Sequence, residues 1–216
     1  KIKKITELSK DIKAKDLHSI SNGIAIYEKN NLKIFYDVAK PSIKLIEKNL
    51  HSGTLSFELS CNKEKIITNC GSIEKRGIKK LDYLRFSAAH STIILNNTNI
   101  SELAEKKSYK RVPENILFDI KDNNDYLIWH GNHDGYRKNF NKIVSRKLFI
   151  SKKGIDILGE DSIISTKMNE KDILYDIRFH LTPICKVSLT RGKNSVLIKT
   201  QLNNSYIFEA DSNLAG

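Results

Sequence analysis

The chain has 216 residues, enough to bury a sizeable core without the disulfides or metals on which small domains depend. Hydrophobic residues make up 39% and charged residues 29%, which excludes a disordered chain. No stretch approaches the roughly 18 uninterrupted apolar residues of a membrane-spanning helix. We therefore expect a folded globular domain.

The net charge is +12, from 37 Lys and Arg against 25 Asp and Glu, which suits a polyanionic partner. The excess is mostly Lys and is spread along the chain, a pattern that an ordinary solvated surface also produces. Nucleic acid is the weaker hypothesis for the partner, because no Arg-rich stripe, zinc motif or aromatic ladder accompanies the charge.

The first elements are a helix and then strands. Apolar residues from Ile2 to Ile12 recur at helical spacing, which predicts a short helix over residues 1–14. From about residue 22 the period changes to two, as in LKIFYDV and TLSFELS, which indicates strands with one apolar face.

The same alternation continues to the C-terminus in KLFIS, GIDILGED, LYDIRFHL, CKVSLT, SVLIKT and SYIFEA. Turn-like breaks such as DNND, SKKG and RGKN separate these runs. Residues 98–115 are polar and charged, so we interpret them as a long loop. Many short strands at this spacing predict an all-β fold, an antiparallel β-sandwich.

Two segments gather polar side chains that bind ligands in other proteins. In LYDIRFHL, Asp176, Arg178 and His180 fall on one face, which suits either an anionic sugar or a surface ion network. In WHGNHDGY, His133 and Tyr136 lie among glycines, which favours either a tight hairpin or a ligand rim. His51 and His90, taken singly, are more typical of structural residues than of metal ligands.

Cys61, Cys70 and Cys185 leave at least one unpaired thiol, and their spacing matches no zinc motif. The sequence starts with Lys1 rather than Met, so we expect a part of a longer protein.

The ordered blocks NLHSGTLSFELS, IITNCGS, LRFSAAHSTIILNNTN, WHGNHDGY, RKLFIS, LGEDSI and IRFHLTP resemble the C-terminal domain of the heparinase II/III-like family of bacterial polysaccharide lyases. They cover residues 50–183, with weaker similarity on both sides. The resemblance implies a β-sandwich over residues 17–216, preceded in residues 1–16 by a linker or the tail of an upstream α/α toroid.

The resemblance also implies the activity. These lyases cleave uronic-acid-containing polysaccharides, among them glycosaminoglycans, by β-elimination, in which a base removes the C5 proton and an acid protonates the leaving oxygen. Their catalytic Asn, Tyr and His lie largely on the toroid, so we expect this chain alone to be inactive and its catalytic residues to lie upstream. A periplasmic or cell-envelope location is implied as well.

One structural divalent metal, Zn²⁺ or Ca²⁺, is implied at His51, Asn69 and His90. His51 matches the second His of a His-x-His-Ala-Asp run, whose first His falls on Asn49. His90 matches an Ala-His-Asn-Thr run. Asn69 stands where relatives carry Asp, and an amide supplies no charge to the metal, although Cys70 is a soft neighbour.

The leading hypothesis is a domain that walls the substrate cleft of a lyase acting on an acidic polysaccharide. Its expected substrate-binding residues are Arg85, His133, Tyr136, Arg178 and His180. Its expected partners are that polysaccharide and the upstream toroid. The alternative is a non-catalytic carbohydrate-binding or structural sandwich, which Asn49 and Asn69 favour.

Overall fold

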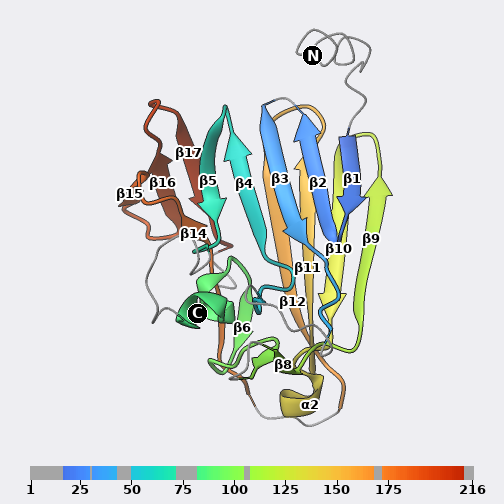
Figure 1. Cartoon of the computed structure of the whole chain (residues 1–216). Helices are drawn as coiled ribbons and strands as arrows, with labels where there is room; N and C mark the ends of the chain where they lie inside the picture. The colour runs from blue at the N-terminus through green and yellow to red at the C-terminus, as the bar shows by residue number, and fades with distance from the viewer. Residues whose placement is uncertain are drawn as a thin grey trace, which may run out of the picture.

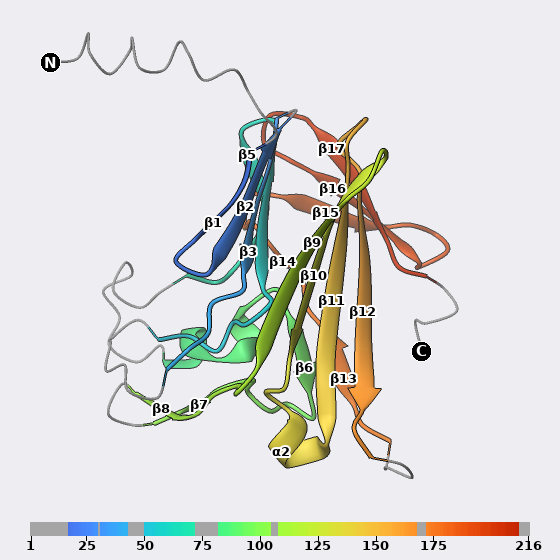
Figure 2. The same ribbon diagram turned by 90° about the vertical axis from the view of Figure 1, so that its right-hand side faces the viewer.

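The computed structural model describes residues 17–29, 31–42, 50–71, 82–104, 108–167 and 172–211. Antiparallel strands dominate these residues, and two sheets face each other across a shared core (Figures 1 and 2). This arrangement confirms the predicted antiparallel β-sandwich. The helix predicted over residues 1–14 and the linker over 1–16 lie outside the described residues. None of the described helices is long and apolar enough to cross a membrane.

The first sheet has the order β1-β2-β3-β4-β5-β14. Its first five strands follow one another along the chain as antiparallel neighbours. Their bounds are Leu17–Ser21, Ile24–Lys29, Leu32–Asp37, Phe57–Cys61 and Glu64–Thr68, and the last strand, β14, is His180–Leu181.

Two tight turns in this sheet explain its short connections. Asn22 and Gly23 join β1 to β2, and Asn62 and Lys63 join β4 to β5, all with φ between 49° and 79°. Positive φ at both central residues gives a turn whose twist matches that of the flanking strands. Gly23 is also required by space, because a Cβ there would lie 2.5 Å from the Cα of Ala39.

The second sheet has the order β12-β11-β10-β9, again antiparallel throughout. Its strands are β9 (Ile116–Asp122), β10 (Tyr126–His133), β11 (Lys142–Ser151) and β12 (Ile157–Ser165). In β10, side chains alternate between partly exposed and buried along the whole strand, as expected for a strand with one face on the core.

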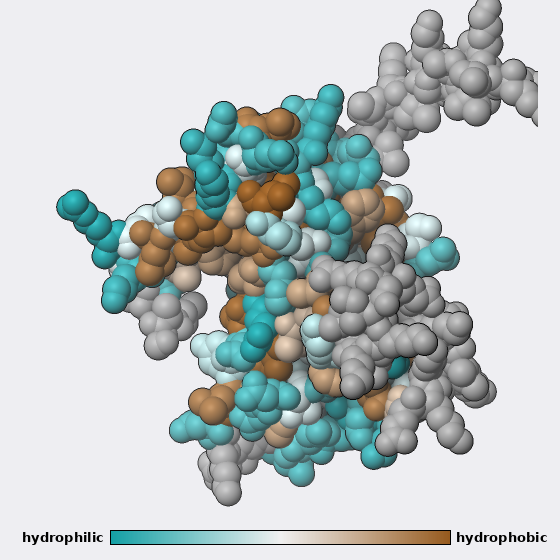
Figure 3. All heavy atoms as spheres, turned by 60° about the vertical axis from the view of Figure 1, so that its left-hand side comes forward, coloured by the Kyte–Doolittle hydropathy of each residue, from teal (hydrophilic) through white to brown (hydrophobic). Residues whose placement is uncertain are grey.

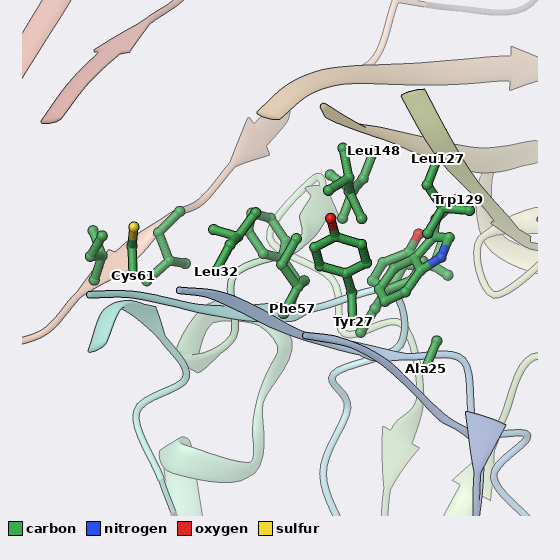
Figure 4. Close-up of a cluster of buried hydrophobic side chains, with 14 of the residues drawn as sticks. Ala25, Tyr27, Leu32, Phe57, Cys61, Leu127, Trp129 and Leu148 are labelled. Carbon is green, nitrogen blue, oxygen red and sulfur yellow. The ribbon is translucent and has the colours of Figure 1, made fainter. Parts of the chain in front are cut away.

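The core lies between these two sheets, and Figure 4 shows its central side chains. Trp129 on β10 is fully buried; its ring stacks on that of Tyr36 at 6.0 Å and meets that of Tyr27 edge-on at 6.5 Å. Aromatic pairs of this kind add to the free energy of burial. The three cysteines are all free thiols.

A third sheet closes one edge of the sandwich. It comprises β15 (Lys186–Leu189), β16 (Ser195–Lys199) and β17 (Ser205–Glu209), in that order. Its inner side chains, among them Ile198 and Phe208, pack against the main core. Figure 1 shows this sheet beside β5, at the edge away from β1.

Short elements form the end of the molecule near β6 (Figures 1 and 2). Strand β6 (Ile93–Leu95) pairs with β13 (Tyr175–Ile177), and β7 (Glu102–Leu103) pairs with β8 (Tyr109–Arg111). The helical turns are η2 (Asp82–Arg85), η3 (Ser87–Ala89) and α2 (Arg137–Phe140).

Three sequence interpretations need correction. Residues 98–115 contain β7 and β8 rather than a loop alone. LYDIRFHL is not one strand: β13 and β14 join different sheets, so Tyr175 and Ile177 are exposed while Phe179 contacts the core. WHGNHDGY is neither a tight hairpin nor a loop throughout, because Trp129 to His133 belong to β10 and α2 follows directly.

Candidate functional site

Three loop segments meet at the β6 end of the sandwich, beside strand β14. They are residues 50–56, residues 69–71 and the segment from η2 to β6. Backbone hydrogen bonds join them: Ser52 N donates to Arg85 O at 2.8 Å, and Cys70 N donates to Ala89 O at 2.9 Å. His51, Asn69, Cys70, His90 and His180 come together in this way.

Hydrogen bonds of buried hydroxyl groups, rather than a regular β-ladder, hold these loops together. The Ser87 hydroxyl lies 2.8 Å from that of Ser52 and donates to the Ser52 carbonyl at 2.7 Å. The same two hydroxyl oxygens accept hydrogen bonds from the backbone amides of Ile100 and Ser101. Because buried polar groups are costly unless paired, this network fixes the loop backbone.

His51 and His90 contact each other directly. The distance between His51 Nδ1 and His90 Nε2 is 3.2 Å, and the two rings are nearly perpendicular, at 81°. His90 Nδ1 lies 2.8 Å from the carbonyl oxygen of Phe86, so Nδ1 carries the proton and Nε2 accepts from His51. Gly53 permits this close packing, since a Cβ there would lie 2.5 Å from the His90 ring.

Burial favours the neutral form of both imidazoles. Burial lowers the pKa of His90 to about 4. Burial also lowers the pKa of His51, and the nearby Arg85 guanidinium lowers it further. A neutral pair satisfies the hydrogen bond between them without placing a charge in a poorly hydrated site.

Asn69 bridges the same loops through both ends of its amide. Its Oδ1 accepts the Ser91 amide at 2.9 Å, and its Nδ2 donates to Ser56 Oγ at 3.3 Å. The Asn69 backbone amide donates to Glu58 at 3.0 Å. Burial opposes ionisation of Glu58, but hydrogen bonds from Lys65, Asn69 and Thr68 outweigh it and hold its pKa below the usual value.

Cys70 and His180 form a second pair at the partly exposed side of this cluster. Cys70 Sγ lies 3.6 Å from His180 Nδ1. His180 Nε2 lies 2.9 Å from the Ala88 carbonyl, which fixes its proton on Nε2 and leaves Nδ1 as the acceptor. His180 is therefore a hydrogen-bonded side chain with limited exposure.

Three of the expected substrate-binding side chains lie inside the protein. His133 and Tyr136 have no exposed surface, and Arg85 is 6% exposed with Nε donating to the Leu50 carbonyl. Burial lowers the pKa of His133 to about 3, so its ring is neutral. A ligand outside the molecule therefore has no surface of His133 or Tyr136 to touch.

Basic side chains do reach the surface nearby. A hollow of about 290 Å³ lies beside the start of α2 and is lined in part by Arg111, Arg137 and Lys138. Arg178 is the accessible member of the expected set: its side chain is 39% exposed and pairs with Asp176 at 3.1 Å. Arg111 and Arg137 lie in two of the basic runs along the chain, KKSYKR and RKNFNK, but nothing in the sequence places these two runs side by side.

The model of the family described as heparinase II/III-like, C-terminal, matches residues 15–215. The chain belongs to this family.

Two solved structures titled heparinase III share the fold. A heparinase III aligns with a TM-score of 0.65 and 13% identity over 91% of this chain and 29% of its own. A heparinase III with methylated lysines aligns with a TM-score of 0.58 and 13% identity over 84% of this chain and 26% of its own.

The chain also resembles one curated protein. FtsZ-localized protein C of Caulobacter vibrioides (strain NA1000 / CB15N) is 24% identical over 197 residues, which cover 84% of this chain and 34% of that protein. This chain therefore spans about a third or less of the length of the relatives that it matches.

Only part of the ligand set is present for the metal that the resemblance to the heparinase II/III-like family implies. His51 and His90 have converging nitrogens, but the Asn69 oxygen already accepts the Ser91 amide. Within the described ranges, no group of three His, Cys, Asp or Glu side chains is arranged to hold a metal. As arranged, these residues do not complete a zinc centre, which needs four donors and favours a charged one.

Arg146 is the positioning residue that sequence reasoning missed. It is 1% exposed, and its Nη1 donates to the carbonyls of Leu55 and Ser91, one from each loop of the histidine pair. Its place in β11 carried a signal, because Val144, Arg146 and Leu148 alternate on the face that points inward. A charged residue at an inward position needs a buried partner, and Asp161 is that partner.

Proposed function

We propose that this chain is the C-terminal domain of a polysaccharide lyase that cleaves an acidic, uronate-containing polysaccharide by β-elimination. The match of a single lyase-family domain to residues 15–215 carries this proposal. In it, the β6 end of the sandwich, with Arg178 and the hollow at Arg111 and Arg137, forms one wall of the substrate cleft.

The chemistry of β-elimination explains why a second domain is needed. The C5 proton becomes acidic enough to remove once the uronate carboxylate is neutralised and a base is within reach. In this chain, His51, His90 and His180 are engaged in hydrogen bonds with protein groups. The base and acid are therefore proposed to come from upstream, and this domain to contribute positive charge that attracts and orients the polymer.

Ultraviolet absorbance of the unsaturated uronate tests the proposal. The full-length protein and this chain are each incubated with heparan, chondroitin, hyaluronan and alginate-type polymers. We expect the absorbance to rise with the full-length protein and not with this chain alone. No rise with the full-length protein on any of the polymers would contradict the lyase assignment.

A second candidate function is a non-catalytic sugar-binding or structural domain. Asn49 and Asn69 stand where the resemblance implies His and Asp, and one curated relative has a name that refers to localisation with FtsZ and not to a lyase. This candidate predicts retention of the full-length protein on an immobilised uronate polymer without release of unsaturated product. A periplasmic or cell-envelope location is proposed for either candidate, and cell fractionation tests it.

A further inference from the structure

Two lysines face each other on the outer side of the C-terminal sheet. Lys186 on β15 and Lys199 on β16 are direct cross-strand partners. Both are exposed, and neither has an ion-pair partner within the part of the chain that the structure describes. Like charges directly opposite each other on a sheet destabilise the pairing. An anion between the two ammonium groups would remove that repulsion.

A hollow of about 300 Å³ opens beside this pair. It is lined by two lysines, a hydroxyl side chain, two amide side chains and an apolar side chain. These are Lys186, Lys199, Thr200, Gln201, Asn203 and Ile184. The volume is at the lower end of the range for small-molecule sites, which suits one or two sugar residues. These groups suit a sugar ring, because amides can hydrogen-bond its hydroxyls and the apolar surface can pack against its C–H groups.

The wall of this hollow is held firmly from behind. The Glu64 carboxylate, which is 8% exposed, accepts hydrogen bonds from the Leu202 amide at 2.8 Å and from Asn204 Nδ2 at 2.7 Å. The Thr200 hydroxyl donates to the same carboxylate. These three donors satisfy the negative charge of Glu64 and fix the turn that carries Gln201 and Asn203 before any ligand arrives.

We propose that this hollow is a second binding site, for an anionic sugar residue of an acidic polysaccharide. Its carboxylate or sulfate lies between Lys186 and Lys199, and Gln201 and Asn203 bind the hydroxyls. The inference rests on the proposed function, in that the protein meets such a polymer. The site lies on the third sheet, away from the β6 end, so it retains a long chain rather than reacting with it.

The same face carries apolar side chains, which an anionic membrane would also contact. Leu197 and Ile207 are neighbours on β16 and β17 and are 40% and 68% exposed. Figure 3 turns this side of the molecule toward the viewer and shows apolar side chains over the third sheet, with hydrophilic ones around it. A flat lipid surface makes no use of a hollow lined with amides, so the saccharide is the occupant that the site fits better.

Titration calorimetry with a heparin-derived hexasaccharide tests the site in the 216-residue chain. The double variant Lys186→Gln, Lys199→Gln is compared with Lys121→Gln, Lys147→Gln, which removes the same charge from the other side of the molecule. We expect the first variant to bind roughly tenfold more weakly and the second to bind like wild type. The first variant should be at least as stable as wild type, because it loses the repulsion between Lys186 and Lys199. The second should melt only slightly below wild type, because the Lys147 pair with Glu160 that it loses is partly exposed.

Three outcomes would overturn the inference. Equal weakening in both variants would mean diffuse attraction by net charge. Loss of binding to phosphatidylglycerol vesicles by the first variant, with hexasaccharide binding unchanged, would make the face a membrane contact. Tight binding of the hexasaccharide by both variants, while the full-length protein releases unsaturated uronate, would leave the lyase function intact and remove this site alone.

Discussion

Arg146 and Asp161 face each other across β11 and β12 and form a two-point ion pair inside the sandwich. The two contacts are 2.7 Å from Nε to Oδ1 and 2.8 Å from Nη2 to Oδ2, and the carboxylate is only 13% exposed. The rings of Phe57 and Phe179 lie within 5.7 Å of the guanidinium. One charged side chain thus joins the second sheet to both loops of the histidine pair.

Replacing Arg146 by Met should lower the free energy of unfolding by about 3 kcal/mol or more, because Asp161 is left partly buried without a partner and two carbonyls lose their donor. Urea denaturation measures this change. Lys147→Met is the matched control: its partner Glu160 is 51% exposed, so we expect a loss below about 1 kcal/mol. Equal losses in the two variants would contradict the role given to Arg146.

Chelation should leave the melting temperature and the native mass of the chain unchanged, because His51 and His90 already satisfy each other by a hydrogen bond. Asn69→Asp supplies the missing carboxylate, so this variant should gain affinity for Zn²⁺, seen as an added metal mass in native mass spectrometry. A metal removed from the wild-type chain by chelator, with a fall in melting temperature, would restore the metal centre implied by resemblance.

Asp37 should make stability depend on pH near neutrality. Burial raises the pKa of Asp37 to about 7, so between the unfolded pKa near 4 and this value the folded state binds more protons. Stability is then present at low pH and is lost as the pH rises toward 7. Asp37→Asn keeps the oxygen that accepts the Ala39 amide, and it should be more stable than wild type by about 2 kcal/mol at pH 8 but not at pH 4.

Thermal unfolding over pH 4 to 8 measures this effect. Asp119→Asn, on an exposed side chain of β9, serves as the control and should follow wild type throughout. A parallel pH profile for Asp37→Asn and wild type would show that the Asp37 carboxyl ionises normally in the folded chain.

Arg178→Ala should elute from an immobilised uronate polymer at a salt concentration lower than wild type by a few tens of millimolar. The reason is that it removes one exposed charge from the proposed cleft wall. Lys121→Ala removes one charge from the opposite region and should elute like wild type. His180→Ala is less informative, since His180 also anchors Cys70 and Ala88. Equal elution of the Arg178 and Lys121 variants would exclude Arg178 from the binding surface.

The strands were predictable because alternation is a local property. In β3, predicted from LKIFYDV, Leu32, Ile34 and Tyr36 are buried and alternate with more exposed side chains, as the period of two requires. The break inside LYDIRFHL was not predictable, because β13 and β14 pair with strands distant in sequence and no residue between them signals a change of sheet.

The site was predicted less well, for two physical reasons. His133 shares the inward face of β10 with Trp129 and is buried, whereas the glycines and polar residues of WHGNHDGY are typical of a hairpin or a ligand rim and conceal this strand. The contact between His51 and His90 depends on how two irregular loops pack, which no spacing in the sequence encodes. The resemblance identified those two residues, and the buried serines explain how the loops bring them together.

The pairing of β5 with β14 bears on how the protein is made. Thr68 meets His180, so the first sheet takes its last strand from a segment synthesised more than a hundred residues later. Contacts of such long sequence separation slow folding, because the chain must close a large loop before they form. On the ribosome, the edge of β5 therefore stays unpaired until the chain has emerged past Leu181, and an unpaired strand edge promotes aggregation.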